Sequence, residues 1–248
     1  MPTLTLAINE ARRFYRLPAA WVLLAAGCFL LGWLFLSRID PYLAMQADLA
    51  KLANPPGVTE LVIAPTFTSS ALILLALIPL LSMRTLAEER RQRTFNLLAS
   101  APLSSWQIVL GKYLGLMFTL LPLIALTALL PFSLLLGGKL DLGLVTANIL
   151  GFVLLATAFA AAGVFTSSLS AHPALAAFGG LLLLLIWSFF PSGAAELGNP
   201  LELISPLKQF EPFNQGLIDS AGLVYFPLVT LLFLALTVLR LEHLKRAG

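Results

Sequence analysis

Long stretches without any charged side chain constrain this sequence more than any other feature. Six such runs hold at least 20 residues each: Leu17–Ser37, Leu61–Met83, Tyr113–Gly138, Leu142–Ala171, Pro173–Ala195 and Ser220–Leu239. A helix needs about 20 apolar residues to cross a bilayer. Hydrophobic residues make up 59% of the chain and charged residues only 11%, and a soluble fold could not bury that much apolar surface. The sequence therefore predicts an all-α integral membrane protein.

The runs predict six membrane-spanning helices in a single transmembrane domain that covers residues 1–248. We place them at approximately residues 17–37, 61–83, 105–138, 142–168, 173–195 and 220–240. Only the short stretch SSLSAHP separates the fourth run from the fifth, so that boundary is the least defined. The first run is expected to be retained rather than cleaved as a signal peptide, because its apolar core is too long and no small-residue cleavage site follows.

The distribution of lysine and arginine predicts which side of the membrane holds the two termini. If both termini are cytoplasmic, eleven basic residues fall in inner segments, and only Arg38, Lys51, Lys139 and Lys208 fall in outer segments. Basic residues collect on the cytoplasmic side of membrane proteins. We therefore expect both termini in the cytoplasm. Residues 1–16 combine an apolar helical face with three arginines, which predicts a short helix at the inner membrane surface.

Two segments are expected on the outer side. Residues 38–60 are interpreted as a polar loop that contains the breaker Asn54-Pro55-Pro56-Gly57. Residues 196–220 mix apolar and charged side chains and contain three prolines, which predicts short helices between the fifth and sixth spans.

Small residues are concentrated where helices would have to approach each other closely. They occur at Ala156–Gly163 and as the Gly111-x-x-x-Gly115 pattern at the start of the third span. Such residues let helix backbones pack tightly in a membrane. Packing within the chain is one interpretation, and a dimer interface is the other.

A charged connector joins the second and third spans. It reads LAEERRQRTFNLLASAPLSSWQIVLGK, from Leu86 to Lys112. The stretch Arg84–Arg93 predicts a charged helical extension of the second span. A short helical turn with an apolar face is expected to follow, and Pro102 prevents that helix from continuing. The turn begins at Thr94, and its apolar side chains are Phe95, Leu97 and Leu98.

The third span has a strong start signal of its own. Ser104 is a suitable N-cap residue, and Gln107 follows three positions later, which gives the S-x-x-Q pattern of a capping box. We therefore expect a new helix to begin directly after Ser104. The connector as a whole is predicted to be a stiff lever with an exposed tip, either an interfacial helix or a docking element for a soluble partner.

The sequence lacks the motifs of a self-powered transporter or an enzyme. Gly137-Gly138-Lys139 does not have the spacing of a P-loop. His172 and His243 lie in different segments and form no metal-binding pattern. The six runs carry no ionisable acid or base of the kind that ion-driven carriers place inside the membrane. We therefore expect no catalytic, cofactor or metal site in this chain. If the protein moves a substrate, the energy is expected to come from another protein.

The connector resembles the cytoplasmic signature of type-2 ABC transporter permeases, a pattern close to EERRSGTLELLLSSPLS-W-IVLGK. The match runs from Glu88 to Lys112, with Arg93 in place of the usual glycine and Asn96 in place of a common glutamate. The stretches TSSLS (166–170) and Ser205–Phe226 are similar to the branch of that family that serves gliding motility and nitrous-oxide-reductase maturation.

The resemblance implies a permease subunit in the inner membrane of a bacterium, without enzymatic activity of its own. It implies a separate cytosolic ATPase that uses ATP and Mg, a second permease copy that is identical or paralogous, and a periplasmic accessory protein as a further candidate partner. It also implies a coupling helix in the connector, where the ATPase would bind. The residues of that interface would be Glu88, Glu89, Arg90, Arg91, Thr94, Phe95, Leu97 and Leu98.

Three other functions compete with that of an ATP-driven exporter or force-transmitting complex. A membrane anchor or assembly factor that transports nothing fits the same spans, and substrate flux would exclude it. An intramembrane enzyme would need clustered polar residues at one depth in several spans, and the sequence shows only scattered serines and threonines. Binding of nucleic acid by Arg90–Arg93 is disfavoured, because positive-inside placement already accounts for those charges.

Overall fold

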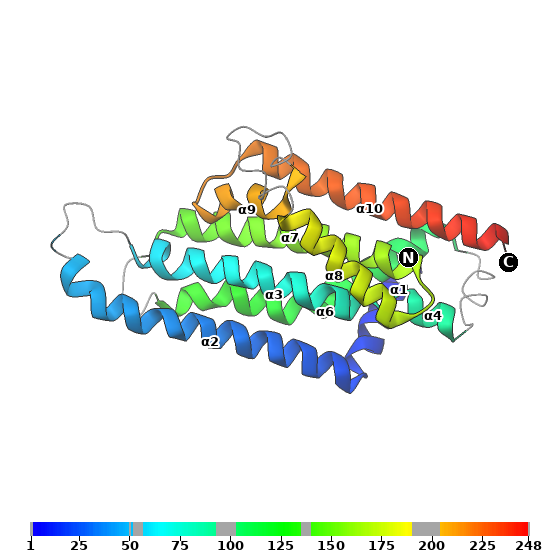
Figure 1. Ribbon diagram of the computed structural model, residues 1–248, viewed down its shortest axis with the longest axis horizontal. Coiled ribbons are helices and arrows are strands. Elements are labelled where there is room, and N and C mark those ends of the chain that lie inside the picture. Colours follow the sequence, from blue (N-terminus) through cyan, green and yellow to red (C-terminus); the bar gives the residue numbers. More distant parts are fainter. Residues whose placement is uncertain are drawn as a thin grey trace.

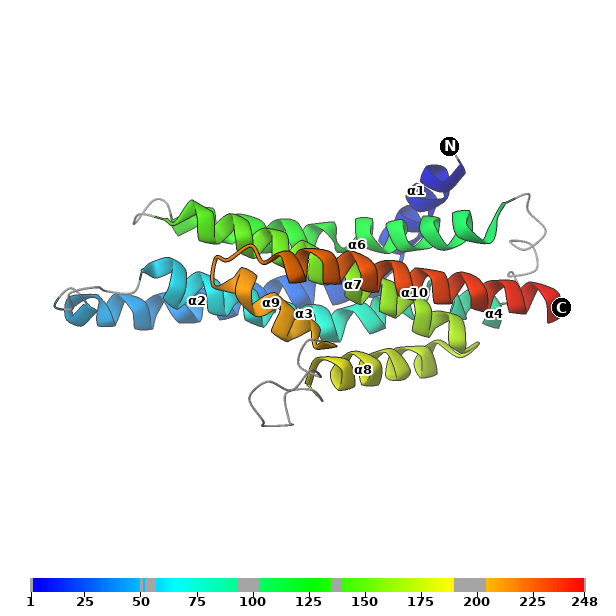
Figure 2. The same ribbon diagram turned by 90° about the horizontal axis from the view of Figure 1, so that it is seen from above.

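The regular structure of this protein is helical throughout the part of the chain that the computed structural model describes, namely residues 2–49, 51, 57–92, 103–134, 140–189 and 204–247. Long helices run side by side along one axis, and the short helix α1 crosses that axis at one end (Figures 1 and 2). The prediction of an all-α fold is confirmed. The helices are α1 (Pro2–Tyr15), α2 (Pro18–Leu49), α3 (Ala64–Ser82, preceded by the π-helical turn Thr59–Ile63), α4 (Ala87–Arg91), α6 (Ser105–Ser133), α7 (Leu142–Leu169), α8 (Pro173–Phe189), α9 (Pro206–Asn214) and α10 (Ser220–Ala247).

Five helical segments in the described residues are long and apolar enough to cross a membrane: Pro18–Gln46, Thr59–Arg91, Ser105–Ser133, Leu142–Leu169 and Ser220–Arg246. They correspond to five of the six predicted spans. The remaining one corresponds to α8, whose 17 residues give about 25 Å of helix, less than the roughly 30 Å hydrocarbon core. The rest of that predicted span, residues 190–195, lies outside the described residues. Helix α1 and the C-terminal end of α10 lie toward the same end of the bundle (Figure 1).

The predicted polar loop after the first span is wrong in its first half, because α2 continues as a helix to Leu49. Arg38, the expected stop, is held against α3 by its side chain. Its two guanidinium nitrogens donate to Thr66 Oγ1 at 3.3 Å and to Ser69 Oγ at 2.7 Å. These two hydroxyl groups satisfy the Arg38 guanidinium in place of water. Helix α2 can therefore continue past Arg38.

The charged helical extension predicted for Arg84–Arg93 is also wrong in part. Helix α3 ends at Ser82, residues 83–86 form turns, and α4 is only five residues long. Thr85 Oγ1 donates to the carbonyl of Ser82 at 2.7 Å, and such side-chain bonds compete with helical ones. The helix of the second span therefore ends at Ser82, about three turns earlier than expected.

Helix α7 is the central helix of the bundle, and its small residues account for this position. The stretch Ala158–Ala162 is fully buried. A Cβ atom at Gly163 would lie 2.7 Å from Ser82 Oγ, and one at Gly151 would lie 2.5 Å from Phe213 Cβ on α9. These small residues therefore serve packing within the chain. Helix α9 itself confirms a short helix in the predicted 196–220 segment.

Helices α1 and α6 cross at the Gly111-x-x-x-Gly115 pattern. A Cβ at Gly111 would lie 2.6 Å from Leu6 Cδ2, and a Cβ at Gly115 would lie 2.6 Å from Glu10 Cβ and 3.2 Å from the carbonyl oxygen of Ala7. Contacts this short leave no room for a methyl group. The two glycines therefore set how closely α1 approaches α6, and with it the position of Glu10.

Gly115→Ala is expected to push α1 away from α6 and to lower stability by about 1–3 kcal/mol, the usual cost of overpacking. The measurement is the midpoint of thermal unfolding of the purified protein in detergent. Gly179→Ala is the matched control, because no atom lies within 4 Å of a Cβ built at that position. Equal midpoints for the two variants would contradict the tight crossing.

Candidate functional site

Lys112 of α6 is fully buried at the end of the bundle where α1 and α4 lie. Its Nζ donates to Glu10 Oε1 at 3.0 Å, to Glu89 Oε1 at 2.6 Å and to the carbonyl oxygen of Thr85 at 2.8 Å. An ammonium group has three hydrogens to donate. Lys112 therefore uses all of its donors on three different segments: α1, α4 and the turn between α3 and α4.

Two glutamates and an arginine complete this cluster. Glu10 and Glu89 are 7% and 8% exposed, and Arg13 Nη1 approaches Glu89 Oε1 at 3.3 Å. We call Glu10, Arg13, Glu89 and Lys112 the ionic junction. Its two positive and two negative charges balance. A buried ion pair contributes little net stability, whereas loss of one partner leaves an unpaired buried charge at high cost. The junction thus fixes the geometry of three segments more than it stabilises the fold.

A second contact attaches the same connector to α7. Ser167 Oγ accepts from the backbone N–H groups of Leu86 and Ala87, both at 3.1 Å, and donates to the carbonyl oxygen of Met83 at 3.3 Å. Helix α4 has no N-cap side chain from its own segment. A serine from another helix therefore satisfies amide groups that the first turn of α4 would otherwise leave without a partner.

The side chain of Arg90 makes a further contact between α4 and the C-terminal end of α7. Its Nη1 donates to the carbonyl oxygen of Ser168 at 2.9 Å, and α7 ends at Leu169. A cation near the C-terminus of a helix stabilises the free carbonyl groups there. The TSSLS stretch singled out in the sequence is thus the part of α7 that holds the connector.

The structure separates the predicted coupling residues into three groups. Glu89 and Arg90 face inward, to Lys112 and to Ser168. Glu88 is half-buried and accepts from Gln92 Nε2 at 3.2 Å, whereas Arg91 is exposed. The other four lie outside the described residues: Thr94, Phe95, Leu97 and Leu98.

The predicted restart of the helix is present. Gln107 N–H donates to Ser104 Oγ at 3.2 Å, and Ser104 N–H donates to Gln107 Oε1 at 3.1 Å. Together they form the capping box at the start of α6. One and a half turns later, the same helix presents Lys112 to the junction.

Sequence reasoning missed Glu10 and assigned Lys112 a different role. The sequence pattern predicts that Lys112 is a basic residue at the membrane edge, but its side chain is buried in the protein. Glu10 lies on the buried face of α1 with Ala7, Ala11 and Phe14. The sequence does contain an indication of this role. Glu10 is the single acidic residue on the apolar face of α1, and an acid at such a position requires a partner when the face is buried.

Comparison with known protein families decides what kind of protein carries this junction. Residues 51–238, more than half of the chain, match the family described as ABC-2 family transporter protein. The chain belongs to the ABC-2 transporter family. It is thus a multi-pass membrane component of an ABC transporter, and the family implies an ABC ATPase as partner and a lipid membrane as surroundings. No curated protein matches the chain.

The family match covers the connector of this ABC-2 permease, together with Lys112 and Ser167. It begins after α2, so Glu10 and Arg13 lie outside it, and it ends before the C-terminal part of α10. Among the described residues, no group of three or more histidines, cysteines, aspartates or glutamates is arranged to hold a metal ion. At one end of the bundle, charges and hydroxyl groups join α1, α4, α6 and α7.

Proposed function

We propose that the chain is the permease subunit of an ATP-driven membrane complex, in which a separate cytosolic ATPase binds ATP and Mg and moves the connector. The work done would be export of a substrate or transmission of force across the membrane. The proposed topology has six spans with both termini in the cytoplasm, in the inner membrane of a bacterium. A second permease copy, identical or paralogous, would complete the pathway, and a periplasmic accessory protein is a further candidate partner.

The burial of Lys112 among three segments is the observation that carries the proposal. Glu89 lies on α4, four residues before the first residue of the connector tip that is not described, Arg93. A displacement of α4 would carry the Glu89 carboxylate with it. Because Lys112 cannot lose that partner without a large cost, α6 and α1 would have to follow. Such an arrangement converts a movement outside the bundle into a movement of helices within it.

The location of charge supports the proposed orientation. Helix α1, helix α4 and the C-terminal end of α10 share one end of the bundle (Figures 1 and 2). Arg12, Arg16, Arg91 and Arg246 are exposed at that end. The basic residues thus gather where the positive-inside rule expects the cytoplasm. The sequence places the proposed ATPase contact on the same side.

The experiment is co-purification of the permease with its ATPase, followed by measurement of ATP hydrolysis. Leu97→Asp and Leu98→Asp would place a charge on the apolar face proposed to bind the ATPase. We expect these variants to lose most of the bound ATPase and of the ATP hydrolysis that depends on the complex. Leu217→Asp is the matched control, since Leu217 is 62% exposed and lies in the segment between α9 and α10.

Unchanged assembly and unchanged ATP hydrolysis in the Leu97 and Leu98 variants would disprove the proposed docking. Loss of assembly in the Leu217 variant to the same extent would show a general defect in folding rather than a binding site. Substrate flux in vesicles that depends on ATP would separate a transporter from a membrane anchor that only recruits its partner.

A further inference from the structure

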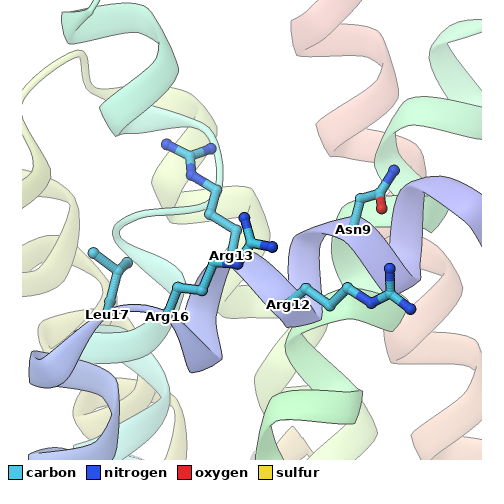
Figure 3. A pocket seen from close by; sticks show the side chains of 5 residues that line it. All are labelled: Asn9, Arg12, Arg13, Arg16 and Leu17. Carbon is cyan, nitrogen blue, oxygen red and sulfur yellow. The ribbon is translucent and has the colours of Figure 1, made fainter.

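The exposed side of α1 carries a positively charged cavity that shares only Arg13 with the ionic junction. It has a volume of about 390 Å³ and is lined by Asn9, Arg12, Arg13, Arg16 and Leu17 (Figure 3). The four polar residues are spaced at i, i+3, i+4 and i+7, so they lie along one face of the helix. Like charges at such spacings repel each other. An anion bound among them would remove that repulsion.

Only one of the three arginines has an acidic partner among the described residues. Arg13 pairs with Glu89 and extends away from Arg12 (Figure 3). Arg12 and Arg16 are exposed, and the described part of the chain gives neither of them an ion pair. The cavity therefore has two guanidinium groups and the Asn9 amide available for a ligand that accepts hydrogen bonds.

The cavity lies where α1 meets the first long apolar helix. Trp21, near the start of α2, donates its indole N–H to the carbonyl oxygen of Tyr15 at 2.7 Å, and the two rings are 5.4 Å apart. Burial raises the pKa of the Tyr15 phenol, so that it stays protonated and donates to the carbonyl oxygen of Phe118 at 3.0 Å. Tryptophan and tyrosine side chains collect at the level of the lipid headgroups. This pair therefore predicts headgroup depth for the neighbouring Arg12 and Arg16.

The direction of α1 agrees with that depth. Helix α1 crosses the axis of the long helices obliquely (Figure 2), so it does not run alongside the membrane spans, and its amphipathic pattern fits a helix at the membrane surface. Exposed apolar side chains on α2 follow the cavity, with Trp21 and Val22 at 55% and 67% exposure. The cavity therefore offers cations for a lipid headgroup, and the adjacent part of α2 offers an apolar surface for the acyl chains of the same phospholipid.

From this geometry we infer that the cavity binds the phosphate group of an anionic phospholipid in the leaflet at the α1 end of the bundle. Guanidinium groups match phosphate oxygens with paired hydrogen bonds. Arg12 and Arg16 bind the phosphate, Asn9 donates a further hydrogen bond, and the acyl chains lie against Leu17 and the exposed side of α2. Because Arg13 both lines the cavity and pairs with Glu89, the lipid is placed next to the ionic junction.

The test is native mass spectrometry of the full-length chain in detergent, titrated with dioleoyl phosphatidylglycerol in the presence of dioleoyl phosphatidylcholine. Each basic residue near a membrane surface contributes about fivefold to the binding of anionic lipid. Arg16→Gln should therefore weaken binding of phosphatidylglycerol about fivefold, and Arg12→Gln combined with Arg16→Gln about 30-fold. If the double variant does not fold, the single variant carries the test.

The matched control removes two charges at the same end of the bundle but outside the cavity, with Lys245→Gln and Arg246→Gln. It should bind phosphatidylglycerol as the unchanged protein does. An equal loss in this control would overturn the site, as would unchanged binding in the arginine variants. Displacement of the lipid by millimolar inorganic phosphate would show a site for free anions and overturn the assignment to lipid.

Discussion

Lys112→Met is expected to destabilise the permease by about 3–5 kcal/mol, the usual cost of removing one partner from a buried ion pair. The side chain is fully buried, and its loss would leave the carboxylates of Glu10 and Glu89 facing each other without the cation between them. The measurement is thermal unfolding in detergent together with the yield of folded protein from membranes. An unchanged unfolding midpoint would contradict the junction.

A triple variant separates the structural cost from the proposed function. Glu10→Met, Glu89→Met and Lys112→Met together remove the three buried charges of the ionic junction, and an apolar replacement of a buried ion network is often neutral or stabilising. Arg13 retains 36% side-chain exposure and can turn to solvent. We expect the triple variant to regain most of the lost stability but not ATP-driven activity, since the three segments would no longer be held by directional contacts.

Ser167→Ala is expected to detach α4 from α7. The hydroxyl group accepts from two buried backbone amides, those of Leu86 and Ala87, which are 1% and 0% exposed. A buried donor left without an acceptor costs about 1–3 kcal/mol. The variant should therefore unfold at a lower temperature and should expose the α4 amides to faster hydrogen exchange.

Ser168→Ala is the matched control for that prediction. Its hydroxyl group is equally buried, but it donates only to the carbonyl oxygen of Phe165 within α7, at 2.6 Å. Its removal leaves no backbone amide unsatisfied. If the Ser168 variant accelerates exchange in α4 as much as the Ser167 variant, the assigned role of Ser167 is wrong.

The long helices could be predicted from the sequence because a single physical requirement defines them. Runs without charge must be helical to satisfy their backbone in a membrane, and α3, α6, α7 and α10 overlap the predicted spans. The capping box at Ser104 was also predictable, because both partners lie within one turn of the chain. Local patterns of this kind do not depend on the rest of the fold.

The ends of the helices and the site itself depend on contacts between distant residues. Arg38 marks the end of a span by composition, yet hydroxyl groups on α3 allow α2 to continue past it. Lys112 and Glu10 are 102 positions apart, and neither residue alone indicates a buried pair. Two of the expected coupling residues, Glu89 and Arg90, face the interior. Local sequence does not indicate this, because their partners lie far away in the chain, on α6 and α7.

The most direct measurement of coupling through the ionic junction is the distance between spin labels on Ile8 of α1 and Leu239 of α10, both of which are exposed. The native Cys28 is replaced by serine so that labels attach only at the chosen sites. Labelled chains are diluted with unlabelled ones, so that each distance is measured within one copy. The complex with the ATPase is compared without nucleotide and with ATP, Mg and vanadate.

The proposed mechanism predicts that nucleotide changes this distance in the unchanged chain and in the Ser168→Ala variant, but not in the triple methionine variant. That result would show that movement of the connector reaches α1 through Lys112 and its partners. The same nucleotide-dependent change in the triple methionine variant would contradict it, because α1 would then follow the ATPase without the ionic junction.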